Sequence, residues 1–150
     1  MRVVIQRVHN AHIHIDHSIS REIKNGMLVL LGIEKNDTTE DSKWLTGKIA
    51  SLRIFDDSDK KMNLSIQDIS GEIMVVSQFT LHASTKKGNR PSWIKAAEPS
   101  YAEPMYKEFV NILQGYINLP IVTGEFGSHM DIKLVNDGPV TIIIDSKKRE

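Results

Sequence analysis

The longest unbroken apolar run in the chain, Met27-Leu28-Val29-Leu30-Leu31, follows the turn-forming pair Asn25-Gly26. Five residues are far too few to cross a membrane, and such a run beside a turn is typical of a β-strand. Because successive side chains point to opposite faces of a sheet, a strand that is apolar at every position has to be buried on both faces. The run therefore requires a fold that covers both sides of its sheet.

Length and composition indicate one cytoplasmic domain. The chain has 150 residues, the size of a single domain that folds without cross-links, and it contains no cysteine. Lysine plus arginine number 19, as do aspartate plus glutamate, so we expect no broad, non-specific attraction to nucleic acid and no DNA partner. The start of the chain lacks the apolar stretch of a signal peptide, and we expect no membrane partner.

Residue patterns predict the other strands. Residues 11–16 alternate small or apolar with polar side chains, which is typical of a half-buried strand. Residues 73–80 form another expected strand, and two final strands are expected on either side of residues 136–139. The polar stretch from residue 82 to residue 99 is expected to be a long loop, a kind of segment that often carries function.

Two helices are predicted by their caps and spacing. Asp37, with Glu40 three residues later, is the expected N-cap of the first, whose apolar stripe comprises Trp44, Leu45, Ile49 and Leu52. Ser100 and Glu103 form an S-x-x-E capping box for the second, with Pro104 in its first turn. Pro120 is expected to end that helix. Its expected buried face comprises Ala102, Met105, Tyr106, Phe109, Leu113 and Tyr116.

These elements predict one α+β domain over residues 1–150, with a tail from about residue 146 that is disordered. Several short strands and few helices favour a strongly curved or closed sheet, because open sheet edges invite mispairing. We therefore expect a small β-barrel-like, mostly antiparallel sheet with two helices.

Metal and cofactor sites are not expected. His12 and His14 share one face of a strand, but Asp16 and His17, the available third ligands, would point to the other face. The run Asp56-Asp57-Ser58-Asp59 resembles the start of a calcium loop, yet Lys61 and Gln67 stand where the loop needs glycine and glutamate. No glycine-rich phosphate loop is present. We predict neither a metal nor another cofactor.

The segment Ser77-Gln78-Phe79-Thr80 places hydroxyl groups at the end of an expected strand. A hydroxyl nucleophile needs a base within hydrogen-bonding distance. His82 is the nearest candidate, but along an extended chain it would lie roughly 7 Å from Thr80. Backbone amides at Phe79 and Thr80 offer an alternative role as an oxyanion hole. A nucleophilic, an oxyanion-binding and a purely structural role all stay open from residue types alone.

The segment Asn136-Asp137-Gly138-Pro139-Val140-Thr141 lies between two apolar runs. Asn136-Asp137-Gly138 alone would be an ordinary hairpin turn, whereas the proline after the glycine restricts the backbone. A cis bond between Gly138 and Pro139 would present two carbonyl oxygens side by side, unobstructed by a glycine side chain. A plain turn and a cis Gly-Pro ligand contact are the two interpretations.

At these residues the chain resembles the D-aminoacyl-tRNA deacylases. The S-Q-F-T and N-x-G-P-V-T motifs are both present, in the family's order and spacing, and the likeness covers nearly the whole chain. Other matching segments are Met1-Arg2-Val3-Val4-Ile5-Gln6-Arg7-Val8, Leu28-Val29-Leu30-Leu31-Gly32-Ile33, Leu52-Arg53-Ile54-Phe55, Lys61-Met62-Asn63-Leu64, Gly88-Asn89-Arg90-Pro91-Ser92 and Thr123-Gly124-Glu125-Phe126-Gly127.

The resemblance implies a homodimeric enzyme that hydrolyses the ester joining a D-amino acid to the 3′-terminal adenosine of tRNA, and that also removes glycine mischarged onto tRNA. Its active site lies at the subunit interface. Residues implied to line the pocket are Ser77, Gln78, Phe79 and Thr80. The implied chirality filter is a cis Gly138-Pro139 from the other subunit, buttressed by Arg7. Phe126 and Met130 match positions beside the adenosine.

Three further expectations concern the substrate and the mechanism. A local basic patch of Lys86, Lys87 and Arg90 is expected to face tRNA phosphates. Because no base is evident for Thr80, the preferred mechanism uses the adenosine 2′-hydroxyl to activate water, with Phe79 and Thr80 amides binding the oxyanion. The alternative functions are a non-catalytic tRNA 3′-end binding protein and a hydrolase of small esters with a Thr or Ser nucleophile. Trp93 departs from the family pattern, where phenylalanine is usual.

Overall fold

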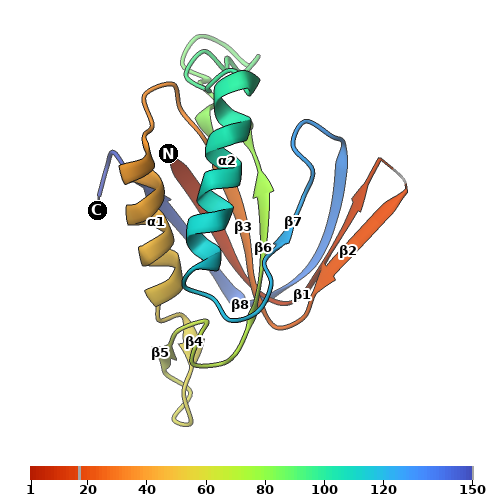
Figure 1. The fold of residues 1–150 in the computed structure, drawn as a ribbon, viewed down its shortest axis with the longest axis vertical. Coiled ribbons are helices and arrows are strands. Elements are labelled where there is room, and N and C mark those ends of the chain that lie inside the picture. The colour runs from red at the N-terminus through yellow and green to blue at the C-terminus, as the bar shows by residue number, and fades with distance from the viewer. Residues whose placement is uncertain (17, 150) are drawn as a thin grey trace.

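The computed structural model describes residues 1–16 and 18–149 (Figure 1). It is an α+β unit in which a strongly curved sheet is partly wrapped by two helices. In chain order the elements are β1 (Arg2–Ile15), β2 (Ile19–Ile23), β3 (Gly26–Gly32), α1 (Thr39–Ser51), β4 (Phe55–Asp56), β5 (Met62–Leu64), β6 (Glu72–Ser77), the 3₁₀ helix η1 (Phe79–His82), α2 (Pro99–Gln114), β7 (Val122–Thr123) and β8 (Met130–Asp145).

The long strand β1 organises the sheet. Along one edge its first half pairs with β3 and its second half with β2, while β8 follows almost the whole of its other edge. All three pairings are antiparallel, whereas β3–β6 and β6–β7 are parallel. The sheet curls until it is nearly a closed barrel, so the predicted mostly antiparallel, barrel-like fold with two helices is confirmed.

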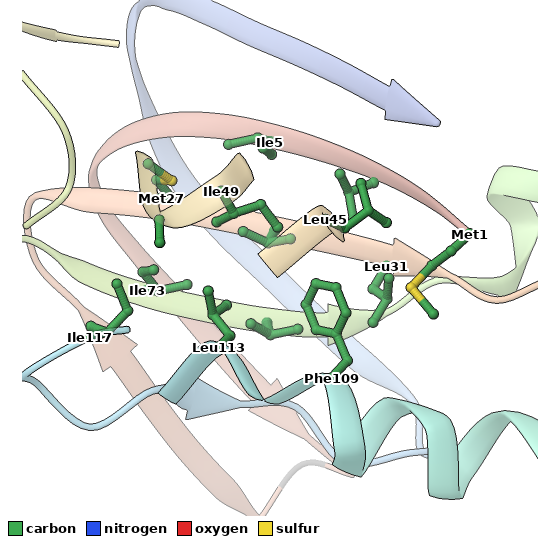
Figure 2. Packing of buried hydrophobic residues seen from close by; sticks show 14 of the residues in the cluster. Met1, Ile5, Met27, Leu31, Leu45, Ile49, Ile73, Phe109, Leu113 and Ile117 are labelled. Atoms are coloured by element: carbon green, nitrogen blue, oxygen red, sulfur yellow. The ribbon is translucent and has the colours of Figure 1, made fainter. Parts of the chain in front are cut away.

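The two helices bury one face of the sheet (Figure 2). Ile49 of α1 and Phe109 of α2 are fully buried in a cluster with Ile5, Met27 and Ile73 from the strands. The helical spacing of apolar residues in both helices supplies this contact face. The predicted helices are therefore present, and they pack where the core requires them.

A second cluster buries the opposite face of β3 and β6. Leu28 and Met74 point into it and meet Ile13 of β1 and Ile23 of β2, with Ile132 of β8 packed alongside. The curl of β1 and β8 brings their far halves over this face (Figure 1). This confirms that residues 27–31 form a strand covered on both sides.

The start of α1 differs from the prediction. Its N-cap is Thr38, which forms a capping box with Asp41, rather than Asp37 with Glu40. Asp37 is used elsewhere, because its carboxylate pairs with the amino group of Met1 and accepts a 2.6 Å hydrogen bond from the Glu34 amide. The buried amino group of Met1 thus binds the Asp37 side chain, which the sequence pattern assigned to the helix cap.

The ends of α2 also differ. The helix begins at Pro99, whose fixed φ suits the first helical position, and Glu98 is the N-cap. Glu103, expected in a capping box with Ser100, instead binds Lys107 at 2.6 Å, and Pro104 lies inside the helix. These boundaries show that the predicted cap was wrong by two residues. The end of the helix was also misplaced.

Specifically, α2 ends at Gln114 with Gly115 as its C-cap, well before Pro120. Tyr116 is 45% exposed and outside the helix, so it does not belong to the buried face as expected. The other five residues of that expected face are all buried.

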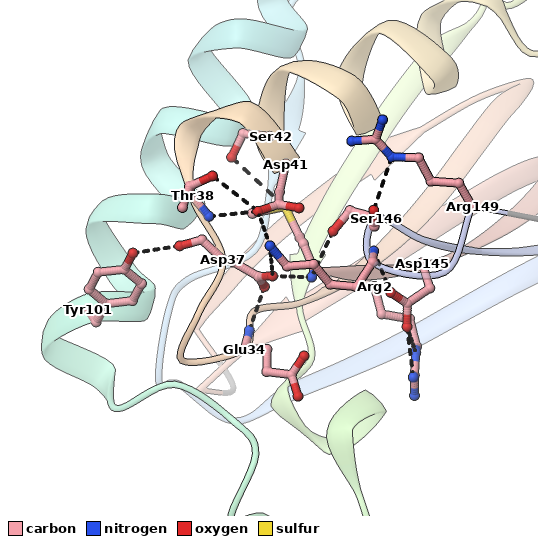
Figure 3. A network of polar contacts seen from close by, with 12 residues as sticks. Arg2, Glu34, Asp37, Thr38, Asp41, Ser42, Tyr101, Asp145, Ser146 and Arg149 are labelled. Carbon is pink, nitrogen blue, oxygen red and sulfur yellow. Dashed lines mark hydrogen bonds and ion pairs between the residues drawn. The ribbon is translucent and has the colours of Figure 1, made fainter.

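Residues 146–149 are packed against the body, so the expected disorder from about residue 146 is wrong for this stretch (Figure 3). Ser146 is buried and its amide donates to the Met1 carbonyl at 2.9 Å. Lys147 binds Asp41 at 2.7 Å, and the Arg149 guanidinium lies 4.5 Å from the centre of the Trp44 ring. These polar and cation–π contacts supply the order that the apolar pattern does not predict.

Candidate active site

A cavity of about 560 Å³ opens between the end of β6, η1, the start of α2 and the segment before β8. Its lining is mostly apolar with a few polar groups, which is typical of a small-ligand site. The lining residues are Leu31, Ile33, Val76, Ser77, Gln78, Phe79, Trp93, Ala96, Ala97, Glu98, Pro99, Ala102, Phe126, Gly127, Ser128, His129, Met130 and Ile132. Five of the residues predicted from the sequence therefore meet here, namely Ser77, Gln78, Phe79, Phe126 and Met130.

The expected strand over residues 73–80 ends early, because β6 stops at Ser77 and the chain turns into η1. The Gln78 amide donates a 2.7 Å hydrogen bond to the Leu31 carbonyl, which ties this turn to the end of β3. A Cβ on Gly32 would lie 3.1 Å from the Gln78 carbonyl oxygen and 3.0 Å from His82 Cδ2. Only a glycine lets η1 lie this close to β3.

The turn leaves two backbone donors unused. The amides of Phe79 and Thr80 begin η1, and the first amides of a helix have no partner within it. Neither donates a hydrogen bond to any group in residues 1–16 and 18–149. Such free amides beside a cavity are the geometry that stabilises a developing oxyanion.

The Thr80 hydroxyl, unlike the Thr80 amide, has a hydrogen-bond partner among the described residues. Gln78 Nε2 donates a hydrogen bond to Thr80 Oγ1, and Thr80 does not line the cavity. His82 is only 4% exposed, and its Nε2 has no hydrogen-bond partner within the described chain. The extended geometry assumed for Thr80 and His82 is wrong, because both belong to η1, but no hydrogen bond between them is present in the described residues.

Two pairs of aromatic rings lie at the cavity, and each pair includes residues that line it. Phe79, 55% exposed, meets Trp93 edge to face with ring centres 5.3 Å apart. Phe126, which lines the cavity as Met130 does, has its ring centre 6.1 Å from that of Tyr106. Burial raises the pKa of the Tyr106 hydroxyl to about 12, and that hydroxyl donates to the Val75 carbonyl at 2.8 Å. Tyr106 is thus a neutral support behind the cavity.

Gly138 and Pro139 lie elsewhere, in the middle of β8. No hairpin divides this strand, so the expected turn between two final strands is wrong. Instead Gln6 pairs with Thr141 and Val8 with Asn136, which leaves residues 137–140 as a bulge opposite Arg7. The Gly138-Pro139 bond is cis, in agreement with one of the two interpretations, and both residues are exposed.

Arg7 anchors this bulge from below. Its side chain is buried, and Nη1 donates to the Ile54 carbonyl at 2.7 Å and lies 3.3 Å from Asp56 Oδ1. Its Nη2 would lie 3.3 Å from a Cβ placed on Gly138. Neither Arg7 nor the bulge lines the cavity of its own chain.

The loop of residues 83–97, hereafter the basic loop, borders the cavity at Trp93. Reciprocal backbone hydrogen bonds of 2.8 and 2.9 Å between Ser84 and Ser92 close it. Lys86, Lys87 and Arg90 are all exposed in it, and within the described residues none forms an ion pair. The expected loop is confirmed, with more internal order than its composition predicts.

The histidine cluster has ordinary partners. His12 Nδ1 lies 3.1 Å from Glu22 Oε2, and His14 Nδ1 lies 2.7 Å from Ser20 Oγ. No group of three potential metal ligands occurs among residues 1–16 and 18–149, and His17 lies outside the described residues. In the same part of the chain no helix is long and apolar enough to cross a membrane.

Sequence reasoning did not assign most of the other lining residues to the site, among them Trp93, Glu98 and His129. Trp93 stands out in the sequence only as a departure from a family pattern, and Glu98 belongs to a polar loop without a motif of its own. Both are brought to the cavity by the approach of the basic loop and α2 to β6, which no local pattern encodes.

Comparisons with known proteins agree with this arrangement. Residues 4–145 match the sequence model described as D-Tyr-tRNA(Tyr) deacylase. A D-aminoacyl-tRNA deacylase of Flavobacterium johnsoniae is 57% identical over 150 residues, with both chains fully covered. One of Thermosipho africanus is 55% identical over 148 residues, covering 99% of each chain.

Two solved structures share the fold. The first, a protein named c-Myc DNA Unwinding Element Binding Protein, has a TM-score of 0.91 and 37% identity, with 97% of this chain and 98% of that chain covered. The second, described as a probable eukaryotic D-amino acid tRNA deacylase, has a TM-score of 0.83 over 95% of this chain and 97% of its own. At 16% identity the second comparison concerns the fold alone.

Proposed function

Since the chain belongs to the D-Tyr-tRNA(Tyr) deacylase family, and is a D-aminoacyl-tRNA deacylase and hence a hydrolase, we propose that it cleaves the ester between a D-amino acid and the terminal adenosine of tRNA. The observation that carries this proposal is the pair of unused amides, on Phe79 and Thr80, beside a cavity with an aromatic end. The cavity is the size of a small-ligand site and suits an aminoacylated nucleoside.

In the proposed reaction the adenosine lies against Phe126 and Met130, and the acyl carbonyl oxygen points at the amides of Phe79 and Thr80. Water, activated by the adenosine 2′-hydroxyl, attacks the carbonyl carbon. The bond from that carbon to the 3′-oxygen then breaks, and the 3′-oxygen takes a proton. Ser77 and Gln78 line the acyl side. The hydrogen bond that Thr80 Oγ1 accepts from Gln78 favours a positioning role for Thr80 over a nucleophilic one.

We further propose that two copies of the chain assemble and that Gly138 and Pro139 of each copy reach into the cavity of the other. Three observations support this. The bulge is exposed and lies outside the cavity of its own chain, and Arg7 holds it. Within the described residues, β8 pairs only with β1, which leaves its outer edge open to a partner. Val135 and Ile143 expose apolar side chains on either side of the bulge.

Such a bulge would reject L-amino acids by clash and leave the D side chain in open space. The same geometry accepts glycine, which has no side chain to reject, so glycine mischarged onto tRNA is a second proposed substrate. Lys86, Lys87 and Arg90 are proposed to contact tRNA phosphates, and the proposed compartment is the cytoplasm.

The test is hydrolysis of D-Tyr-tRNA, L-Tyr-tRNA, Gly-tRNA and a small D-amino-acid ester by the purified protein. We expect cleavage of the D-Tyr and glycyl substrates alone. A protein that binds tRNA ends without catalysis would cleave none of them, and a general esterase with a Ser77 or Thr80 nucleophile would cleave the small ester.

A gel-shift assay with duplex and single-stranded DNA belongs beside this experiment, because one of the two structural relatives is named as a DNA-binding protein. We predict no specific DNA complex at physiological salt.

A further inference from the structure

The basic loop has an unusually one-sided composition for a chain whose net charge is zero. Between residues 83 and 97 it carries Lys86, Lys87, Arg90 and Lys95 and no carboxylate. None of these four cations forms an ion pair within residues 1–16 and 18–149, whereas Lys43, Lys107 and Lys147 all do. The loop therefore carries a local positive electrostatic potential that would attract an anionic ligand.

The same loop also carries a partly exposed aromatic ring, that of Trp93. Trp93 is 39% exposed although it lines the cavity, and it is braced edge to face by Phe79 at 5.3 Å. Its backbone follows directly on Ser92, which the bridge to Ser84 fixes. A braced, partly exposed indole next to unpaired cations is the combination that binds single-stranded nucleic acid, in which bases stack on aromatic rings and cations face the phosphates.

The place of Trp93 in the chain indicates which nucleotide of a bound tRNA 3′ end it would contact. In the proposed function, on which this inference rests, the terminal adenosine lies at the Phe126 end of the cavity. Trp93 belongs to the basic loop and also lines the cavity. The chain of a tRNA 3′ end that leaves the cavity along this loop passes Trp93 first.

We propose that Trp93 is a specificity-determining residue that stacks on the base preceding the terminal adenosine, with Lys95 joining the proposed phosphate contacts of the loop. The occupant is the single-stranded 3′ end of tRNA. Stacking is indifferent to base identity, so this contact measures the length of the nucleotide substrate rather than its sequence.

The first test compares three D-tyrosyl esters: of adenosine, of the trinucleotide CCA and of full tRNA. We expect Trp93→Ala to lower kcat/KM by about ten-fold or more for the trinucleotide and the tRNA, mainly through KM, and to leave the adenosine ester within about two-fold. Trp93→Phe keeps a stacking ring and restores most of the loss. Ile94→Ala is the matched control, because Ile94 is 74% exposed in the same loop and does not line the cavity.

A salt titration separates stacking from charge. Replacing Lys86 and Lys87 by alanine is expected to reduce the dependence of kcat/KM on salt concentration, whereas Trp93→Ala leaves that dependence unchanged. Equal losses on all three esters would make Trp93 a wall of the cavity and would overturn the proposal. So would an unchanged trinucleotide reaction.

The second test needs no catalysis and so separates this proposal from the proposed function. The chain has two tryptophans, and Trp44→Phe leaves Trp93 as the sole indole. We expect the uncharged trinucleotide CCA, which carries no amino acid, to quench its fluorescence and adenosine to leave it nearly unchanged. Quenching without any ester hydrolysis would keep the stacking contact and reject the deacylase function. Ester hydrolysis without quenching by the trinucleotide would keep the deacylase function and reject the stacking contact.

Discussion

Arg7 Nε lies 2.9 Å from Asp137 Oδ2, so a buried side chain of β1 holds the bulge of β8 by charge. The contact is an ion pair without an aligned hydrogen bond, because the Nε proton is not directed at the carboxylate. Asp137 is also 3.4 Å from His9 Nε2. The position of Gly138 therefore depends on side chains from a strand that the sequence places far away.

Removing the anchor should disturb selectivity as well as stability. Arg7→Ala removes the bond to the Ile54 carbonyl and the pairs with Asp56 and Asp137. We expect a loss of about 2 kcal/mol in the free energy of unfolding and a lower ratio of D-Tyr-tRNA to L-Tyr-tRNA hydrolysis. Urea denaturation and paired kinetic assays measure the two effects. Arg53→Ala is the control, because this exposed arginine donates a hydrogen bond to the Asn63 carbonyl and contacts neither the bulge nor the cavity; it should leave the hydrolysis ratio unchanged.

The close approach of η1 to β3 predicts a functional role for Gly32. In Gly32→Ala the new methyl group would meet His82 and the Gln78 carbonyl, so η1 has to shift together with the Phe79 and Thr80 amides. We expect a ten-fold or greater fall in kcat, because oxyanion donors act only when aimed. Gly47→Ala is the matched control in α1, where the added methyl meets only Tyr116 Oη at 3.8 Å. That change should raise stability by about 0.5–1 kcal/mol and preserve turnover.

The contact between Gln78 and Thr80 predicts that the threonine hydroxyl is not the nucleophile. Thr80→Ala keeps the backbone amide, so we expect at least a tenth of the wild-type kcat on D-Tyr-tRNA. A substrate ending in 2′-deoxyadenosine should be inert with either protein. Complete loss of activity in a correctly folded Thr80→Ala protein, checked by circular dichroism, would instead assign the nucleophile to Thr80.

The pair of Asp41 and Lys147 predicts how stability depends on pH (Figure 3). Burial alone would raise the pKa of the Asp41 carboxyl, but hydrogen bonds from Lys147, Ser146 and Thr38 hold that pKa well below its usual range. The stabilisation from the ionised Asp41 is thus fully present above about pH 4, the pKa range of an unfolded aspartate. It is lost as the pH falls toward the lowered pKa that Asp41 has in the folded protein. The hydrogen bond to Asp41 raises the pKa of Lys147, so on the alkaline side the loss begins above about pH 10.

Asp41→Asn should therefore cost about 2 kcal/mol at pH 7, and its difference from the wild type should shrink below pH 4. Urea unfolding at a series of pH values measures this. Glu40→Gln, at a neighbouring carboxylate that is 78% exposed, should cost less than about 0.5 kcal/mol at any pH. A pH-independent difference for Asp41→Asn would contradict the ion-pair account.

The Tyr106 hydroxyl should ionise only in strongly alkaline solution. Burial raises the pKa of its hydroxyl to about 12, so its contribution to stability is complete below about pH 10 and is lost as pH rises toward 12. Tyr106→Phe removes the bond to the Val75 carbonyl and should cost about 1 kcal/mol at neutral pH. Near-ultraviolet absorbance titration should lose the step near pH 12 in this variant and keep it in Tyr116→Phe.

Local patterns were sufficient for some elements. The run from Met27 to Leu31 determined a strand buried on two faces, and the apolar spacing around Ile49 and Phe109 determined two helices, because period and burial are properties of adjacent residues. Ser77, Gln78 and Phe79 were singled out by a motif, and Phe126 and Met130 by the family resemblance. The structure brings all five to one cavity.

The remaining features depend on partners distant in the sequence. Asn136-Asp137-Gly138 has the chemistry of a hairpin turn, but both halves of β8 gain their hydrogen bonds from β1, so the strand continues and the turn becomes a bulge over Arg7. Asp37 has the chemistry of a helix cap, but the Met1 amino group takes its carboxylate. The sequence by itself determined that residues 27–31 form a strand buried on both faces and that two amphipathic helices pack on the sheet. Tertiary structure decided which groups the polar side chains bind, because a charged side chain pairs with the opposite charge or hydrogen-bonding group that the fold brings within reach.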